Sequence, residues 1–344
     1  MTMNIYPLIK PLLFTTNPDK AHQLTLSFLS RLPNALCRSL IKNRVTDPTE
    51  CFGLTFANKV GLASGFDKNG IAINALFALG FGFIELGGVT PEPQAGNPKP
   101  HMLRIPRHNS LINHCGLNNH GVKQLRLQLQ KPRLDGIVGV NIAANKTTPL
   151  EQAYHDYGLC LNEIYAYCDF ISANISCPNV QGKNASDQLK QSLNIAEHIC
   201  EQREQQKQII GQYKPLLIKI SPDTDKESLK LFCDQINPLP IDGIICGNTT
   251  ISRPEPLSKQ EKDFSGGLSG ELLTNKACCQ VESLKAVLTD SKPVIAVGGI
   301  HDLQSAKLAI KAGAQLVQIY TALIYHGPEI IKMIAKALKA STSK

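Results

Sequence analysis

Eight short apolar runs, each followed by polar residues and then by a stretch of helical periodicity, constrain the fold of this chain most strongly. The runs predict strands at 59–64, 82–88, 137–142, 170–175, 215–220, 242–247, 293–298 and 315–320. Helices are expected between them, among others at 149–165, 186–204, 225–236, 302–312 and 327–339. Near-continuous apolar strands are typical of a parallel sheet that is buried on both faces. Eight strand–helix units therefore predict an α/β fold of the closed (β/α)8 TIM barrel type.

An open, doubly wound sheet is the alternative. A dinucleotide-binding sheet of that kind carries G-x-G-x-x-G directly after its first strand, and no such motif follows residue 64. The total of 344 residues leaves room for a barrel and an extension. We therefore expect a barrel over 46–344, preceded by a helical extension over 1–45.

The extension is predicted from short helical patterns. Asn17 can cap a helix with Pro18 at its first position. Apolar residues then recur at helical spacing, and a second short pattern follows the break "LPN" at 32–34. The apolar face of these helices either packs on the chain's own barrel or contacts a bilayer or a lipid-like molecule. The pattern alone leaves both readings open.

Composition narrows the class of protein. Hydrophobic residues make up 42% and charged residues 19%, which is ordinary for a soluble globular protein, and no run is long and apolar enough for a membrane span. The net charge of +8 suits an anionic ligand, a phosphate-bearing cofactor or an anionic lipid surface. Nucleic acid is not expected, because no dense Lys/Arg tract is present. The 11 cysteines include no C-x-x-C pair, so no metal centre is expected.

Chemistry-bearing residues gather where the predicted strands end, which is where barrels place their active sites. Asparagines recur in these segments, at 113, 118, 141, 174, 179 and 248. Carboxamides both donate and accept hydrogen bonds, so a ring of them suits a planar, imide-like ligand. Lys219 alternates with apolar residues in "LLIKIS" and is expected to point into the barrel mouth, while Gly298–Gly299 and Tyr320–Thr321 fit a phosphate site, assisted by the helix that begins at "HDLQSA".

In these motifs the chain resembles the dihydroorotate dehydrogenases, the flavin enzymes of pyrimidine synthesis. The resemblance runs from about residue 6 to 335 and is carried by "GFDKNG", "GVTPEPQAGNPKP", "INHCGLNNHG", "NISCPN", "KISPD", "GNTT", "SGGLSG" and "AVGGI". The N-terminal "PDKAH" is similar to the quinone-linked, membrane-associated class, whose extension forms a quinone tunnel.

The resemblance implies roles for individual residues. FMN would be bound by Ala63, Ser64, Gly65, Gly88, Asn141, Asn174, Lys219, Gly247, Gly270, Gly299, Tyr320 and Thr321. Dihydroorotate or orotate would be bound by Lys68, Asn113, His114, Cys115, Gly116, Leu117, Asn174, Asn179, Asn248 and Thr249. His22, Arg104 and Tyr320 match positions that face the quinone.

The implied reaction has two halves. A base removes a proton from C5 of dihydroorotate while a hydride leaves C6 for FMN, and the reduced flavin then passes its electrons to a quinone. The base position holds Cys177, where the quinone-linked class usually has serine and the soluble classes have cysteine. Gly88 and Gly247 also stand where that class often has threonines, and Ala144 where it often has a lysine. Because a thiol is more acidic than a hydroxyl, we interpret Cys177 as the general base.

The resemblance predicts a quinone as electron acceptor, with a soluble, fumarate-linked enzyme as the alternative. A non-catalytic barrel that binds membrane surfaces is a further alternative, which predicts a colourless protein. We expect a monomer that binds peripherally to the cytoplasmic side of the cell inner membrane through its N-terminal helices.

Overall fold

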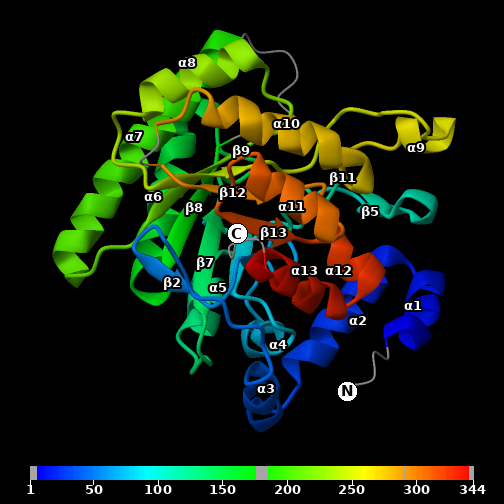
Figure 1. The fold of residues 1–344 in the computed structure, drawn as a ribbon. Helices are drawn as coiled ribbons and strands as arrows, with labels where there is room; N and C mark the ends of the chain where they lie inside the picture. The colour runs from blue at the N-terminus through cyan, green and yellow to red at the C-terminus, as the bar shows by residue number, and fades with distance from the viewer. Residues whose placement is uncertain (1–5, 176–184, 290–291, 341–344) are drawn as a thin grey trace.

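The structure is a computed structural model and describes residues 6–175, 185–289 and 292–340. Eight parallel strands close into a barrel in the order β10-β12-β13-β3-β4-β7-β8-β9 (Figure 1). They are β3 (Val60–Leu62), β4 (Phe83–Val89), β7 (Ile137–Ile142), β8 (Phe170–Asn174), β9 (Leu216–Ile220), β10 (Gly243–Cys246), β12 (Val294–Val297) and β13 (Leu316–Ile319). Each predicted strand is present, and closure of the sheet excludes the open alternative.

Helices surround the barrel. The predicted ones are α6 (Ala153–Ile164), α7 (Ala185–Ile210), α8 (Lys226–Ile236), α11 (Leu303–Lys311) and α13 (Glu329–Ala340). The structure adds α4 (Ile73–Ala78), α5 (Val122–Leu129), α9 (Lys259–Asp263), α10 (Thr274–Lys285), α12 (Thr321–His326) and the short 3-10 turns η1 (Pro106–His108), η2 (Leu150–Gln152), η3 (Tyr165–Tyr167) and η4 (Glu271–Leu273).

An antiparallel hairpin closes the end of the barrel at which the strands begin. It consists of β1 (Thr49–Cys51) and β2 (Leu54–Phe56). Phe56 packs edge-on against Phe83, the first residue of β4, with ring centres 5.0 Å apart, and Phe83 contacts Phe170, the first residue of β8. Aromatic packing thus fills this end, and the polar side chains inside the barrel lie nearer the opposite end.

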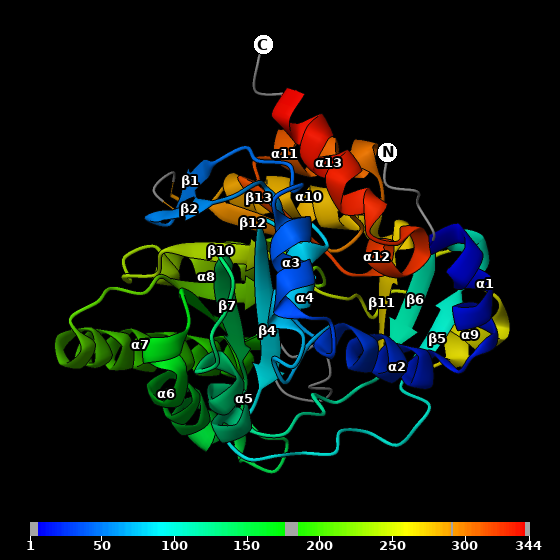
Figure 2. The same cartoon turned by 90° about the horizontal axis from the view of Figure 1, so that it is seen from below.

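Two N-terminal helices, α1 and α2, lie beside a small sheet at the side of the barrel, while the third, α3, lies against α4 (Figure 2). The helices are α1 (Tyr6–Thr15), α2 (Pro18–Ser30) and α3 (Asn34–Ile41), and Asn17 caps α2 as predicted by accepting the N–H groups of Asp19 and Lys20. The antiparallel sheet has the order β11-β6-β5, with β5 at Met102–Ile105, β6 at Ser110–Asn113 and β11 at Gly267–Gly270. Among the helices of the described residues, none combines the length and the apolar character that a bilayer span requires.

Buried polar contacts join α1 and α2 to the segments after the barrel strands. The Asp19 carboxylate accepts the His101 N–H at 3.1 Å and lies 2.9 Å from His101 Nδ1. Arg104 of β5 donates to the carbonyls of Phe14 and Thr16. These contacts place the extension on the side of the barrel where the strands end.

Candidate active site at the strand ends

A carboxylate with no solvent exposure, Glu85 of β4, organises the polar side chains inside the barrel. Its Oε1 accepts hydrogen bonds from the side chains of Asn141 at 3.2 Å and Ser172 at 2.5 Å. Its Oε2 accepts from three further donors: the Ser64 N–H at 3.1 Å, Lys219 Nζ at 3.3 Å and Gln318 Nε2 at 3.1 Å. The carboxylate therefore fixes four side chains and one backbone N–H from five other barrel segments, and we call these six residues the Glu85 cluster.

The cluster confirms that Lys219 points into the barrel. Its ammonium also donates to Ser64 Oγ at 2.8 Å. Asn174, at the end of β8, stands beside Lys219 in register, and its side-chain oxygen is buried without a partner among the described residues. Gln318 Oε1 is in the same situation. Buried acceptors and an ammonium group at one level of the barrel suit a planar heterocycle with N–H and carbonyl groups.

Sequence reasoning missed Glu85, Ser172 and Gln318. All three are polar residues within apolar strands, and all are fully buried. The signal that identified Lys219, a polar side chain in an otherwise apolar alternation, would have found them. A charged residue in a buried strand requires a partner, so Glu85 and Lys219 could have been predicted as a pair.

The segment 113–117 covers the end of β4. The backbone of His114 donates to the His101 carbonyl at 2.6 Å, and Gln94 Nε2 donates to the carbonyls of Gly116 and Leu117, both at 3.2 Å. A Cβ atom at Gly88 would lie 3.1 Å from Leu117 Cδ2 and 3.2 Å from Asn141 Oδ1. The structure thus brings the predicted substrate segment next to the Glu85 cluster, with Gly88 leaving the space between them.

Lys68 lies near this segment. Its Nζ donates to the Gly65 carbonyl at 3.0 Å. Burial raises the pKa of the Cys115 thiol, and the nearby charge of Lys68 partly opposes that rise. Lys68 therefore supplies positive charge beside residues 113–117, as a ligand with a carboxylate requires. Ala63 and Gly65 continue the chain from β3 on the same side.

The segment after β10 requires glycine at its first position. Gly247 has φ +112°, and a Cβ atom there would lie 1.9 Å from the Val297 carbonyl oxygen. The threonine that the resembled class often has cannot occupy this backbone without a shift. Asn248 and Thr249 follow directly, and the Asn248 side chain accepts the Thr249 N–H at 2.9 Å.

The predicted phosphate residues collect after β11, β12 and β13. Gly299 has φ +72°, and a Cβ atom there would lie 2.4 Å from Thr274 Cα. Ser269, beside Gly270, forms a hydroxyl–hydroxyl contact of 2.9 Å with Thr321. The sequence predicts that the helix beginning at "HDLQSA", which is α11, would help to bind the phosphate. In the structure, Asp302 caps this helix by accepting the Ser305 N–H at 2.8 Å. A carboxylate at that position opposes phosphate binding, so α11 does not offer its N-terminus.

The three residues predicted to face a quinone lie at the junction of the extension and the barrel. The rings of His22 and Phe66 are 5.1 Å apart, and Phe66 and Tyr320 are 5.5 Å apart. Burial, with a smaller contribution from Lys68, lowers the pKa of His22 to about 4, so the ring is neutral at physiological pH. The Arg104 guanidinium lies 4.6 Å from the centre of the Phe14 ring. An aromatic path thus connects α2 with the end of β13.

Two predicted residues, Cys177 and Asn179, lie outside the described residues. Asn113 lies at the end of β6, and its side chain donates to the Gly267 carbonyl at 3.3 Å. The structure otherwise places every predicted site residue at the strand ends or at the junction with the extension.

Comparisons with known proteins agree with this geometry. A family model described as dihydroorotate dehydrogenase matches residues 48–341. The quinone-type dihydroorotate dehydrogenase of Enterobacter sp. (strain 638) is 41% identical over 330 residues, which cover 96% of this chain and 98% of that protein. That of Coxiella burnetii (strain Dugway 5J108-111) is 42% identical and covers 98% and 97%. The crystal structure of the Eimeria tenella enzyme with ferulenol superposes with a TM-score of 0.83 at 29% identity, over 96% of this chain and 93% of that one.

Proposed function

The chain belongs to the dihydroorotate dehydrogenase family, and from this premise we propose that it oxidises dihydroorotate to orotate with a quinone as electron acceptor. The observation that carries the proposal is the sequence identity of 41% and 42% to quinone-type relatives, over nearly the whole chain including the N-terminal extension. The aromatic path from His22 to Tyr320 supports it, because it joins the extension to the barrel. The fumarate-linked alternative is not favoured.

The enzyme is a flavoprotein, and we propose FMN as its flavin. When bound, the flavin takes two electrons from dihydroorotate and gives them to the quinone. Lys219, Asn141 and Asn174 would bind the ring, since they lie together at the barrel end. Gly270, Gly299, Tyr320 and Thr321 would bind the phosphate. The positive φ and close backbone approach at Gly299 support this assignment.

We propose that Lys68, residues 113–117, Asn248 and Thr249 bind the substrate, with Asn179. Lys68 would pair with the carboxylate of dihydroorotate, and the amides would bind its ring. Cys177 is proposed to take the C5 proton. Cys177→Ala should then slow anaerobic reduction of the bound flavin by dihydroorotate at least about hundredfold, as loss of a general base does. Cys177→Ser is the matched variant, and unimpaired reduction in Cys177→Ala would refute the assignment.

We propose that residues 1–45 form the membrane-facing extension of a barrel that spans 46–344, in a monomer bound to the cytoplasmic side of the inner membrane. Large apolar side chains on α1 and α2 support this: Leu8 is 76% exposed, Leu12 72% and Phe28 65%. Replacing these three by serine in the full chain should reduce binding to vesicles of anionic lipid. Leu231→Ser on α8, also exposed, is the control, and equal loss in both proteins would contradict the assignment.

The decisive test of function combines a spectrum with turnover. The purified protein should show flavin absorbance that dihydroorotate bleaches under anaerobic conditions. Steady-state turnover should then occur with a short-chain quinone and not with fumarate. A colourless protein, or turnover with fumarate alone, would refute the proposal.

A further inference from the structure

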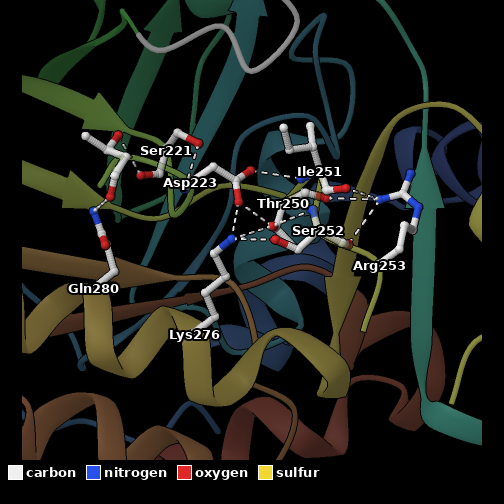
Figure 3. A network of polar contacts seen from close by, with 9 residues as sticks. Ser221, Asp223, Thr250, Ile251, Ser252, Arg253, Lys276 and Gln280 are labelled. Atoms are coloured by element: carbon white, nitrogen blue, oxygen red, sulfur yellow. Dashed lines mark hydrogen bonds and ion pairs between the residues drawn. The ribbon is translucent and has the colours of Figure 1, made fainter. Parts of the chain in front are cut away.

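An ion pair outside the barrel centre contacts the segment that follows β10, and we propose that this pair positions Asn248 and Thr249 for the substrate. The pair is Asp223, after β9, and Lys276 of α10, and we call it the clamp (Figure 3). The inference rests on the proposed function, in which Asn248 and Thr249 bind dihydroorotate. Neither clamp residue is placed on the substrate, so both would be positioning residues.

The clamp contacts three successive residues of the segment. Asp223 Oδ2 accepts the Ile251 N–H at 2.8 Å, and Oδ1 accepts the Thr250 hydroxyl. Lys276 Nζ donates to Asp223, to Thr250 Oγ1 at 3.1 Å and to Ser252 Oγ at 2.6 Å. Asp223 thus binds both the backbone and a side chain directly after Thr249, and Lys276 binds the same hydroxyl from the other side.

The segment is fixed on its opposite flank as well. Thr250 exchanges two backbone hydrogen bonds with Leu268 of β11, at 2.9 and 2.7 Å. Arg253 donates to the carbonyls of Phe264 and Gly266 at 2.9 and 2.8 Å. Because Gly247 enters the segment with a backbone that only glycine adopts readily, the positions of Asn248 and Thr249 depend on what anchors residues 250–253.

The clamp differs from an ordinary surface ion pair in two ways: Asp223 and the Thr250 that it binds are largely buried, and further hydrogen bonds hold the loop that carries Asp223. Thr250 is 2% exposed and the Asp223 side chain 14%, although Lys276 remains 37% exposed. The Asp223 N–H donates to Ser221 Oγ at 3.1 Å, and Gln280 of α10 donates to the Thr224 carbonyl at 3.2 Å. The loop after β9, the segment after β10 and α10 are therefore joined in one network.

The clamp gives a distinctive pattern of substitution effects. In Asp223→Asn the amide keeps its shape but offers one acceptor oxygen, so either the Ile251 N–H or the Thr250 hydroxyl loses its acceptor. Lys276→Met removes three donated hydrogen bonds and keeps much of the side-chain volume. If both act through one segment, the double variant should lose little more than the stronger single variant, since coupled residues are not additive.

The experiment uses purified, flavin-loaded full-length enzyme, and measures orotate affinity from the flavin absorbance change, together with KM for dihydroorotate and for a short-chain quinone. Asp223→Asn and Lys276→Met should each weaken orotate binding and raise the dihydroorotate KM about tenfold, the effect of losing hydrogen bonds to a charged group. Flavin content and the quinone KM should not change. Lys262→Met is the matched control, because Lys262 pairs with Glu255 on the exposed part of the same β10–β11 connection.

Orotate affinity equal to that of the parent enzyme in both variants would overturn the inference, and so would parallel changes in the quinone KM. If either variant folds poorly, Thr250→Val removes the shared hydroxyl and must give the same selective loss. Amide exchange at Ile251 should also accelerate in Asp223→Asn. A parent enzyme that binds no orotate would instead refute the proposed function, and with it the clamp's role in substrate binding.

Discussion

Glu85→Gln tests whether the buried carboxylate organises the barrel interior. Glu85 is fully buried. Its Oε2 accepts hydrogen bonds from the Ser64 N–H, the Gln318 amide and the Lys219 ammonium. The glutamine NH₂ group fits best at the Oε1 position, where Ser172 can turn to accept and Asn141 still reaches Ser172 Oγ at 2.8 Å. The substitution therefore removes mainly the negative charge beside Lys219.

The expected loss of unfolding free energy in Glu85→Gln follows from the ion pair between Glu85 and Lys219. At the 3.3 Å separation of Lys219 Nζ and Glu85 Oε2, an effective dielectric constant of about 20 gives an attraction of roughly 5 kcal/mol. Removing one partner of a buried pair costs about 3–5 kcal/mol in other proteins, which agrees. Since domains unfold with about 5–15 kcal/mol, the loss is a large part of the total. The melting temperature should fall by roughly 5–10 °C, because about 1 kcal/mol shifts a protein of this size by 2 °C or slightly less.

Urea unfolding followed by circular dichroism measures this loss in Glu85→Gln, Lys219→Met and the double variant. The double variant should be more stable than the sum of the two losses predicts, because it contains neither charge. A loss below about 1 kcal/mol in Glu85→Gln, or strict additivity, would refute the reasoning, since a buried pair of this kind cannot be that weak. Ser258→Ala, at the exposed cap of α9, controls for the loss of an ordinary hydrogen bond.

Three further predictions concern other parts of the molecule. The pKa of His22 is about 4 in the folded protein and 6.5 in the unfolded chain, so the unfolded chain binds more protons between these pH values. The free energy of unfolding should therefore decrease as pH falls from 6.5 to 4, by at most about 1.4 kcal/mol per pH unit. In His22→Asn, the free energy of unfolding measured against pH should change less over this range. Gly247→Ala should cost at least about 3 kcal/mol in urea unfolding, because strain and overlap add, whereas Gly53→Ala, at φ +74° with open space around it, should cost about 1–2 kcal/mol. Asp19→Asn should destabilise the protein by about 1–3 kcal/mol, measured in the same way, and an unchanged value would show that the contact with His101 is not stabilising.

The barrel could be predicted from the sequence because each strand carries its own apolar run. Lys219 could be placed inside for the same local reason. The sheet β11-β6-β5 could not, because Gly267–Gly270 pairs with a strand that ends at Asn113, far earlier in the chain, and no periodicity reveals such a partner. Asp302 shows a second limit. The sequence "HDLQSA" is compatible with a phosphate site or with a self-capped helix, and only the structure shows that the Asp302 carboxylate accepts the Ser305 N–H.

His101 connects the N-terminal extension with residues 113–117. Its ring and N–H contact Asp19 in the extension, while its carbonyl accepts the N–H of His114 in the proposed substrate segment. Truncation of the first 45 residues, an obvious route to a more easily purified protein, would therefore remove more than the N-terminal helices themselves. It would remove the carboxylate partner of a buried imidazole and loosen the backbone behind residues 113–117, which we propose bind orotate. Inhibitor screens on such a shortened protein would then sample a proposed substrate site whose backbone support differs from that of the intact protein.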